Sequence, residues 1–472
     1  MARSHTLRGQ AGAPSPCAHY DALIVGAGPA GSAAAILLAQ RGWSVALIER
    51  ERFPRRKVCG ECVSASNLPL LQALGVAEPF RALAGAPLQR IAVWADRRTI
   101  SAPLPPLPDS DEPYGRALGR ERLDALLLAR ARALGVTIWQ PCCAQRLYGR
   151  AGAWLCELRS GRGGGASFTL SAAVAIDAHG SSRGSACVAG RRGRRGRELL
   201  GFKANYAGAR LADDLLPVLC FPGGYGGLVL AGGQLATLAC CIRADRLQRF
   251  RAGRSLPAGA AVECYLRMHC APLAAALAGA ERRGAWLAMG ALQPGIHLDA
   301  AHCGPLGAGA FRVGNAAGEA HPIIGEGISM ALQSAALLSQ LLLACPSVFE
   351  SSPSAESAQR ALAARYASEW RRRFGPRLRW AAWLAYAAMR PVLTRTLVPL
   401  LGRHPALLTR WAHRSGKVEP LELPAAIAFQ DAAGSTSTAA PKAHSPPPMQ
   451  SIAQRGICHD DDARATHAHP GR

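Results

Sequence analysis

Six residues near the N-terminus have the types and spacing of a turn that binds nucleotide phosphates. They read G-x-G-x-x-G and are Gly26, Ala27, Gly28, Pro29, Ala30 and Gly31. In such a turn the first glycine permits the tight bend, the second lets the backbone approach a pyrophosphate, and the third lets the next helix pack against a strand. The helix that begins here would direct its free N–H groups and positive dipole end at the anion. The pattern predicts dinucleotide binding, but it does not choose between NAD and FAD.

A carboxylate follows this turn at the distance that such a site requires. Glu49 stands 18 residues beyond Gly31, at the end of a short apolar run. In dinucleotide sites a carboxylate at this place accepts hydrogen bonds from the ribose hydroxyls. We therefore place Glu49, with Arg50 beside it, among the cofactor-binding residues.

A second reactive cluster lies in the segment "FPRRKVCGECVS", residues 53–64. Cys59 and Cys62 have the spacing of a redox dithiol, and the three basic residues before them would lower a thiol pKa. The alternative for Cys59 is a small buried residue in a tight turn. Glu61 is a candidate proton donor, or else a support for the loop. Cys59 and Glu61 are therefore candidate catalytic residues.

The elements that must position these residues alternate between strand and helix. Short apolar runs predict buried strands, and longer amphipathic or alanine-rich stretches predict helices. The predicted strands are residues 21–25, 44–49, 136–139 and 172–178, and the predicted helices are residues 29–41 and 120–135. Residues 201–245 alternate and contain many glycines, which favours antiparallel sheet. Residues 310–343 return to a strand, a loop and a long helix.

Length and composition indicate the number of domains and the kinds of partner that the protein has. The chain has 472 residues, of which 49% are apolar, enough for two domains or one large domain with an insertion. Its formal net charge is +24, but only four of the basic residues are lysines and no nucleic-acid-binding motif accompanies them. We therefore expect no nucleic-acid partner. No run reaches the ~18–20 apolar residues of a membrane span and no secretory signal is recognisable, so we expect a cytoplasmic protein.

Three further segments follow the glycine turn in a fixed order. They read "RALGRERLDALLLARARALGV" from residue 116, "AIDAHGSSRGSA" from residue 175 and "FRVGNAAGEAHPIIGEGISMALQSA" from residue 311. Together with the turn they resemble the fingerprints of flavoprotein hydroxylases and their relatives, and the resemblance covers roughly residues 20–400. It implies FAD as the cofactor, extended from the first turn to the last of these segments.

The last segment implies contacts to the ribityl and flavin parts of FAD. Asn315, where the family usually has Asp, would meet the ribityl chain and the pyrophosphate region. A second helix N-terminus would lie beside the isoalloxazine, where its N–H groups stabilise negative charge on the reduced ring. The residues that bring it there would be Pro322, Gly325, Gly327 and Ile328.

The two middle segments imply further cofactor-binding residues. Arg120 would reach the phosphates or the ribityl side of FAD, with a surface arginine at a helix start as the alternative. Asp177 and Gly180 would support the flavin domain from beneath, and Asp177 is alternatively a structural turn residue. His179 is unusual in this segment, and we interpret it as a packing variant rather than a base.

Two segments favour one branch of this family. "FPRRKVCGECVS" resembles the Pro-x-x-Lys-x-Cys-Gly-Glu segment of geranylgeranyl reductases and of some flavin-dependent halogenases. "FPGGYGGLVL", residues 221–230, resembles the reductases' Pro-x-x-Tyr-x-Trp segment, with Gly227 in place of the Trp. Tyr225 is a candidate catalytic residue that orients the substrate, with simple packing as the alternative. The halogenases' Trp-x-Trp-x-Ile-Pro segment is absent, and so are the clustered cysteines of a quinone-linked electron-transfer flavoprotein.

The expected fold class is α/β, a doubly wound Rossmann-like FAD-binding domain with an inserted antiparallel-sheet substrate domain and a helical C-terminal region. The expected divisions are 1–18 (disordered), 19–200 (FAD-binding domain, first part), 201–295 (antiparallel substrate-binding domain), 296–345 (FAD-binding domain, second part), 346–424 (helical C-terminal region) and 425–472 (disordered tail). The apolar, basic C-terminal helices are expected to cap the substrate cavity. Peripheral contact with a membrane is the alternative, which Pro391 and Pro399 disfavour by breaking any long amphipathic face.

These observations predict an FAD-dependent oxidoreductase near the geranylgeranyl reductases. It would take electrons from transiently bound NAD(P)H and reduce an apolar isoprenoid or polyketide-like substrate, with a protein acid supplying the proton. The alternative is an FAD-dependent monooxygenase that hydroxylates an aromatic substrate, because both reactions use the same FAD site. A flavin-binding protein without turnover is a third interpretation, since Asn315 and Gly227 depart from the family's pattern. The sequence carries no signal for the oligomeric state.

Overall fold

The computed structural model describes residues 19–161, 165–181, 196–298, 309–346 and 353–422. All of them belong to one of the two units into which the chain divides, Met1–Phe429. The expected disordered ends, 1–18 and 425–472, lie outside the described residues.

The first sheet is the parallel sheet that the sequence predicts around the glycine turn. Its strand order is β7 (Thr137–Trp139), β2 (Val45–Ile48), β1 (His19–Val25), β10 (Ser167–Asp177), β9 (Ala153–Ser160) and β8 (Cys142–Arg150), and β17 (Phe311–Arg312) pairs with β10. Strands β1, β2, β7, β10 and β17 run parallel, whereas β8 and β9 form an antiparallel hairpin beside β10. Every residue of β2 is buried, as expected for a parallel strand covered on both faces. The carboxyl ends of β1, β10 and β17 meet at one edge, where such sheets bind ligands.

Three helices that are far apart in the sequence pack together beside this sheet. They are α1 (Pro29–Ala39), α4 (Arg120–Ala133) and α9 (Gly327–Leu343), and α1 contacts both of the others. Ten of the 11 residues of α1 are buried, and its first turns consist of small side chains. These small side chains let α9 and its preceding loop approach the glycine turn closely.

The second sheet combines strands from two separate stretches of the chain. Its order is β15 (Glu281–Ala291), β11 (Leu199–Ala207), β14 (Leu235–Arg243), β13 (Gly224–Leu230), β12 (Leu215–Phe221), β4 (Arg90–Ala95) and β5 (Arg98–Pro103). All neighbouring strands are antiparallel except β12 and β4, which are parallel. Because β4 and β5 precede α4, this sheet uses residues from the stretch 19–200 as well as from 201–295. The domain boundaries expected from the sequence stay predictions.

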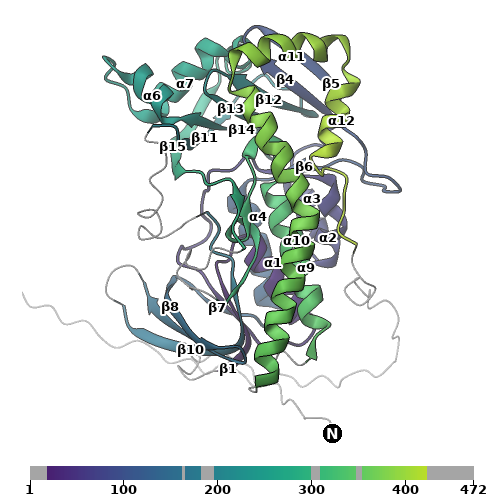
Figure 1. Ribbon diagram of the computed structural model, residues 1–472. Helices are drawn as coiled ribbons and strands as arrows, with labels where there is room; N and C mark the ends of the chain where they lie inside the picture. The colour runs from purple at the N-terminus through teal and green to yellow at the C-terminus, as the bar shows by residue number, and fades with distance from the viewer. Residues whose placement is uncertain (1–18, 162–164, 182–195, 299–308, 347–352, 423–472) are drawn as a thin grey trace, which may run out of the picture. The chain divides into compact units, whose positions relative to one another are not determined.

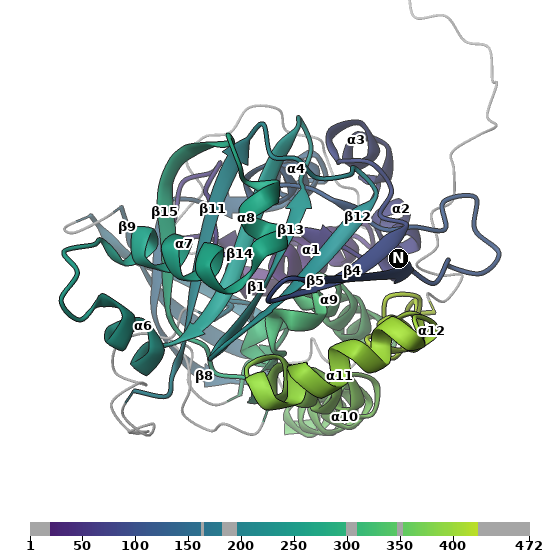
Figure 2. The same cartoon turned by 90° about the horizontal axis from the view of Figure 1, so that it is seen from above.

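Helices cover both faces of the second sheet. On one face lie α6 (Ala244–Arg251), α7 (Ala258–His269) and α8 (Ala271–Ala276), which share an apolar core with the strands, and Figure 2 shows α7 and α8 over them. On the other face α11 (Pro391–Arg403) and α12 (Ala406–Arg414) contact β4 and β5. They follow α10 (Pro353–Ala388), which runs beside α9 and reaches this sheet (Figure 1).

The remaining elements are short. They are β3 (Cys62–Val63), η1 (Ala65–Asn67), α2 (Leu68–Ala73), α3 (Ala77–Leu83), β6 (Arg116–Ala117), β16 (Gly295–Ile296), η2 (Gly314–Ala316), β18 (Gly318–Glu319) and η3 (Pro322–Ile324). Among the described helices, none is long and apolar enough to span a membrane.

One expectation about the C-terminal helices is wrong. Pro391 begins α11, but Pro399 lies inside that helix and does not end it. A proline inside a helix removes one backbone hydrogen bond, and the neighbouring Val398 and Leu401 are buried against the second sheet. Packing therefore outweighs the local cost, and α11 keeps a continuous amphipathic face.

Candidate functional site

A single large cavity of about 1320 Å³ extends from the glycine turn to the second sheet and the C-terminal helices. Pockets for one drug-sized molecule measure roughly 300–1,000 Å³, so this one has room for an extended dinucleotide and a second molecule. The sequence-predicted residues that line it are Gly26, Gly28, Pro29, Ala30, Glu49, Arg50, Cys59, Glu61, Arg120, Gly180, Tyr225, Asn315, Pro322, Gly325, Gly327 and Ile328. Three others, Ala27, Gly31 and Asp177, do not line it.

The three glycines of the first turn have different surroundings. A Cβ on Gly26 would lie 2.4 Å from the carbonyl oxygen of Ala178, and one on Gly31 would lie 1.8 Å from that of Gly26. Gly26 also has a φ of +105°, which favours glycine. Around Gly28 the nearest protein atom to such a Cβ is 3.7 Å away. The first and third glycines therefore serve packing, and the second faces open space where a phosphate could approach.

Two guanidinium groups border that open space. The atoms nearest to a Cβ on Gly28 belong to Arg120 and Arg55. Arg120 donates from Nε and Nη2 to the buried carboxylate of Asp124, at 2.7 and 2.8 Å, and Arg55 Nη1 lies 3.3 Å from the same carboxylate. Burial acts to lower the pKa of Arg120, but Asp124 outweighs it and the pKa is raised. Two guanidinium groups thus lie beside the N-terminus of α1, which suits a pyrophosphate.

Arg55 has donor capacity that the protein leaves unused. Its Nε and Nη1 are buried and form no hydrogen bond with the described residues, because the contact of Nη1 with Asp124 is an ion pair without hydrogen-bond geometry. Sequence reasoning placed Arg55 only in a basic run and missed Asp124. The spacing of Arg120 and Asp124, four residues apart on a helix, was the signal that would have found the carboxylate.

Glu49 lies at the cavity wall and also shapes the glycine turn. Its Oε2 accepts a hydrogen bond from the backbone N–H of Ala27 at 3.0 Å, and its Oε1 accepts one from the N–H of Glu51 at 2.9 Å. Oε2 also lies 3.5 Å from Arg55 Nη2, whereas Oε1 keeps a further lone pair. Glu49 can therefore hold the turn and still accept a hydrogen bond from a ribose hydroxyl.

Asp177 serves the loop after β10 rather than the cavity itself. Its Oδ1 accepts from the backbone N–H of His179 and is hydrogen-bonded to the imidazole Nδ1 of the same residue. The loop then continues through Gly180, with a φ of +76°, into the cavity wall. This geometry corresponds to the structural alternative for Asp177.

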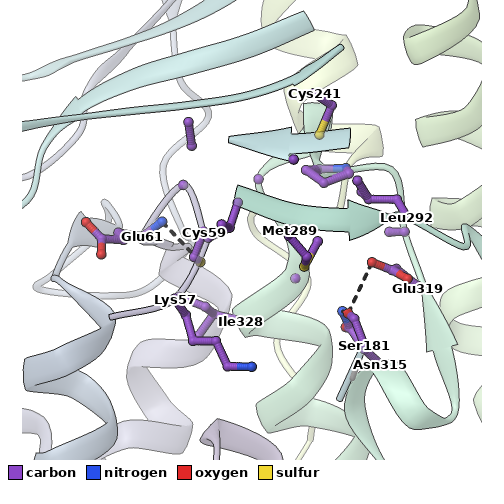
Figure 3. Close-up of a pocket in the computed structure, with 18 of the residues that line it drawn as sticks. Lys57, Cys59, Glu61, Ser181, Cys241, Met289, Leu292, Asn315, Glu319 and Ile328 are labelled. Atoms are coloured by element: carbon purple, nitrogen blue, oxygen red, sulfur yellow. Dashed lines mark hydrogen bonds between the residues drawn. The ribbon is translucent and has the colours of Figure 1, made fainter. Parts of the chain in front are cut away.

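The loop around Asn315 is anchored on both sides. The preceding Gly314 packs so closely on α1 that a Cβ there would lie 2.9 Å from the Cβ of Ala30. Asn315 Nδ2 donates to Ser181 Oγ at 2.8 Å, and Ser181 donates to the buried carboxylate of Glu319 at 3.2 Å (Figure 3). An aspartate at position 315 could not donate to Ser181. The asparagine can therefore form a hydrogen bond that an aspartate could not. Ser181 and Glu319 were not identified from the sequence as neighbours of this residue.

The N-terminus of α9 is held in place by the C-terminal segment. Gly325 has a φ of +68°, and Glu326 is completely buried next to it. Lys417 Nζ donates to Glu326 Oε1 and to the carbonyl oxygen of Ile324, both at 3.0 Å, and Ser64 donates to the same carboxylate. Burial acts to lower the pKa of Lys417, but Glu326 outweighs it and the pKa is raised. This ion pair fixes the loop that would lie beside a flavin ring.

Glu61 is engaged by the protein through both carboxylate oxygens. Oε1 accepts from Lys203 Nζ and from the backbone N–H of Arg120, and Oε2 accepts from Thr237 Oγ1 at 2.6 Å. Glu61 is 1% exposed and Lys203 is completely buried. In Figure 3 the carboxylate points away from Asn315 and Met289. The arrangement suits a support of the loop better than a free proton donor.

Cys59 lies in the same loop and lines the cavity. Its Sγ accepts a hydrogen bond from the N–H of Glu61 at 3.3 Å (Figure 3). Cys62 is buried, and burial raises the pKa of its thiol. Both cysteines are free thiols in the structure. A dithiol couple is disfavoured because Cys62 resists forming the reactive thiolate.

Tyr225 and His321 form a hydrogen-bonded pair at the cavity. Tyr225 Oη lies 3.0 Å from His321 Nδ1, and the tyrosine is 1% exposed. Burial raises the pKa of Tyr225 well above its usual range and lowers the pKa of His321 to about 4. Both groups are therefore neutral near pH 7. The direction of their hydrogen bond depends on the imidazole tautomer, and with the proton on Nδ1 the imidazole donates to Tyr225 Oη and leaves the hydroxyl hydrogen available to the cavity. Sequence reasoning missed His321, although it directly precedes the predicted Pro322.

Beyond this pair the cavity becomes apolar. Its walls come from the second sheet and from α10, α11 and α12, and include Val93, Val218, Leu384, Leu397, Leu401 and Trp411. Gly227 also lines this part, and the nearest atom to a Cβ there, Pro217 O, is 3.4 Å away. Gly227 stands where the reductases' segment has a tryptophan, and the space beside it is open to the cavity.

Comparison with known proteins supports the assignment of the first part of the chain. Residues 19–153 match the family described as FAD binding domain. Menaquinone reductase of Mycolicibacterium smegmatis is 46% identical over 57 residues, which are 12% of this chain and 14% of that protein. Other curated matches include halogenases and monooxygenases. The chain spans only 11–14% of the length of the first curated relatives.

Solved structures share the fold over most of the chain. The flavin-dependent brominase Bmp2 superposes with a TM-score of 0.63 at 18% identity, and the match covers 85% of this chain and 94% of that one. A geranylgeranyl bacteriochlorophyll reductase-like protein from Thermoplasma acidophilum superposes with a TM-score of 0.56 at 18% identity, covering 84% of this chain and all of that one. At this identity the likeness is one of fold.

These findings confirm the predicted fold class and an FAD-binding domain in residues 19–153. The class of enzyme, an FAD-dependent oxidoreductase, agrees with the names of the relatives and stays a prediction for the whole protein. The cofactor prediction is confirmed for an FAD-binding domain, and NAD(P)H stays a prediction. Halogenases and monooxygenases are more prominent than reductases among the relatives. Nearness to the geranylgeranyl reductases is therefore still a hypothesis.

Proposed function

We propose that this protein uses FAD and NAD(P)H to reduce a carbon–carbon double bond of an apolar, uncharged small molecule of isoprenoid or polyketide-like type. The observation that carries the proposal is the continuity of the cavity. The part of the cavity beside the glycine turn, which we call the polar arm, is continuous with the part lined by the second sheet and the C-terminal helices, which we call the apolar arm.

The residues of the polar arm fit FAD. The open side of Gly28, the unused donors of Arg55 and the N-terminus of α1 suit the pyrophosphate. Glu49 suits the adenosine ribose, and the start of α9 suits the flavin ring. When bound and reduced by NAD(P)H, FAD supplies a hydride to the substrate.

The chain's own residues supply the other requirements of a reduction. The apolar arm excludes water and orients the substrate. Tyr225 is the proton donor that we favour, because its hydroxyl is un-ionised, lines the cavity and is hydrogen-bonded to His321. Reduction of the double bond adds a hydride and a proton. The hydride, with both electrons, comes from the reductant, and Tyr225 supplies the proton. His321 keeps the hydroxyl in place and connects it to the partly exposed side of the loop.

Two relatives support this choice of reaction. One is the menaquinone reductase and the other is the reductase-like fold neighbour. The alternative, oxygen insertion into an aromatic substrate, is supported by a curated relative, 6-methylpretetramide 4-monooxygenase of Streptomyces rimosus, which is 43% identical over 68 residues.

The purified FAD-loaded protein tests the proposal with NADH or NADPH and a panel of isoprenoid and polyketide-like alkenes. Product formation without oxygen, with one nicotinamide consumed per double bond, is the expected result. Oxygen consumption coupled to hydroxylated product would establish the monooxygenase instead. Tight FAD binding with no product under either condition would leave a flavin-binding protein without turnover.

A further inference from the structure

The outer side of the C-terminal helices carries large apolar side chains. Trp383 and Tyr386 of α10 are 43% and 51% exposed, and Val392 and Leu400 of α11 are 72% and 42% exposed. Residues three apart, or eight apart, lie on the same face of a helix. Each helix therefore presents its pair on one face.

The same stretch is strongly basic. Residues 379–414 contain six arginines and no acidic residue. The arginines at positions 395 and 403 are spaced to lie on the exposed face of α11 between and beside its two apolar residues. Arg390 packs over the ring of Tyr386, with 3.3 Å between its guanidinium carbon and the ring centroid. Exposed aromatic and aliphatic side chains are thus interleaved with positive charge.

An adjoining side of the same helices, about 100° round the helix from most of these residues, forms the wall of the apolar arm. Leu384 and Ala387 of α10, and Leu397 and Leu401 of α11, line the cavity. One layer of helix therefore separates the apolar arm from the exposed face.

We propose that this face, defined by Trp383, Tyr386, Val392, Leu400, Arg390, Arg395 and Arg403, binds the surface of an anionic lipid bilayer. Amphipathic helices with arginines beside large apolar residues bind such surfaces by burying the apolar side chains among the headgroups and pairing the cations with anionic lipids. A second copy of the chain fits the face poorly, because it would place two sets of arginines together. The idea that the bilayer supplies an apolar substrate rests on the proposed function. The binding of this face to a bilayer does not depend on that function.

Vesicle flotation with the full-length, FAD-loaded protein tests the proposal. Vesicles of phosphatidylcholine alone are compared with vesicles that contain one quarter phosphatidylglycerol, at low and high salt. We expect binding to the anionic vesicles that weakens with salt. Each arginine removed, for example Arg395→Ala or Arg403→Ala, should weaken binding about fivefold, since a surface arginine contributes roughly 1 kcal/mol.

A paired variant separates the apolar contribution from a loss of folding. Val392→Glu with Leu400→Glu should reduce binding at least tenfold, whereas Met268→Glu, on α7 and 63% exposed, should leave it unchanged. FAD absorbance and thermal unfolding verify that each variant is folded. Equal binding of wild type and the paired variant would overturn the proposal, and so would a dimer in light scattering that the paired variant abolishes. Neither readout uses turnover, so failure here is distinct from failure of the proposed reaction.

Discussion

Lys417 donates from Nζ to the buried carboxylate of Glu326 at 3.0 Å, across 91 positions of the sequence. The C-terminal part of the described chain thereby holds the loop in which α9 begins. Because this loop would border the flavin, the C-terminal segment influences the cofactor site as well as the substrate arm.

Replacing Lys417 by Met should leave the Glu326 carboxylate buried without its partner. Removing one member of a buried ion pair costs about 3–5 kcal/mol, so we expect a stability loss of that size and weaker retention of FAD. Urea unfolding and flavin absorbance after gel filtration measure both. Lys417→Met combined with Glu326→Gln should recover much of the stability, and a double variant no better than the single one would contradict the role of the pair.

Substitutions at two glycines of the first turn should affect folding and FAD binding separately. Gly31→Ala would place a Cβ 1.8 Å from a carbonyl oxygen, so we expect poor folding. Gly28→Ala meets no protein atom within 3.7 Å and should fold normally, but it should lose FAD affinity about tenfold or more because the methyl group occupies the approach of the pyrophosphate. Thermal unfolding and FAD titration of the two variants distinguish these outcomes. Normal FAD affinity in Gly28→Ala would place the pyrophosphate elsewhere.

Stability should fall in mild acid because of His321. The pKa of His321 is about 4 in the folded protein against 6.5 for an ordinary histidine. Below pH 6.5 the unfolded chain therefore binds a proton that the folded chain refuses until about pH 4, and stability is lost as the pH falls through this interval. We expect His321 to contribute a loss of about 2 kcal/mol between pH 7 and pH 5. Urea unfolding at both values should show a smaller loss in His321→Asn, while the exposed control His404→Asn should behave as wild type.

Tyr225→Phe should remove the proton donor without disturbing the cofactor. General acids contribute about 10²–10⁴-fold to a rate, so kcat should fall by that factor while FAD affinity and nicotinamide-dependent flavin reduction stay unchanged. Tyr206→Phe, in the core on the other face of the second sheet, serves as the control. A kcat for Tyr225→Phe within twofold of wild type would assign the proton to another group.

Gly227→Trp should narrow the apolar arm. The site of a Cβ at Gly227 has no neighbour closer than 3.4 Å and opens to the cavity, so an indole can enter it. We expect the largest substrates to lose kcat/KM by tenfold or more and the smallest to be affected little, with Gly227→Ala in between. Competition assays with substrates of graded size measure this order. A uniform loss across all sizes would indicate damage to the fold instead.

Most of the cofactor prediction rested on short sequence patterns. Strands β1 and β2, the turn between β1 and α1, and the loop before α9 were predicted because each depends on residues that are close in sequence. The mixed second sheet was predicted only in part, since the pairing of β12 with β4 joins residues more than a hundred positions apart. The expectation for Pro399 is wrong because tertiary packing, which the local sequence does not show, offsets the local cost of a proline in α11.

By itself the sequence determined where a glycine turn suited to a phosphate, a carboxylate placed for a ribose and a second glycine-rich loop occur, because steric freedom and hydrogen bonding within a few residues define these features. Only the tertiary structure decided which side chains complete them. Arg55 with Asp124, Lys203 with Glu61, and Tyr225 with His321 come together from different elements. No periodicity links such partners along the chain. Burial selects them, since a charge or hydroxyl removed from water is stable only beside a partner that folding brings to it.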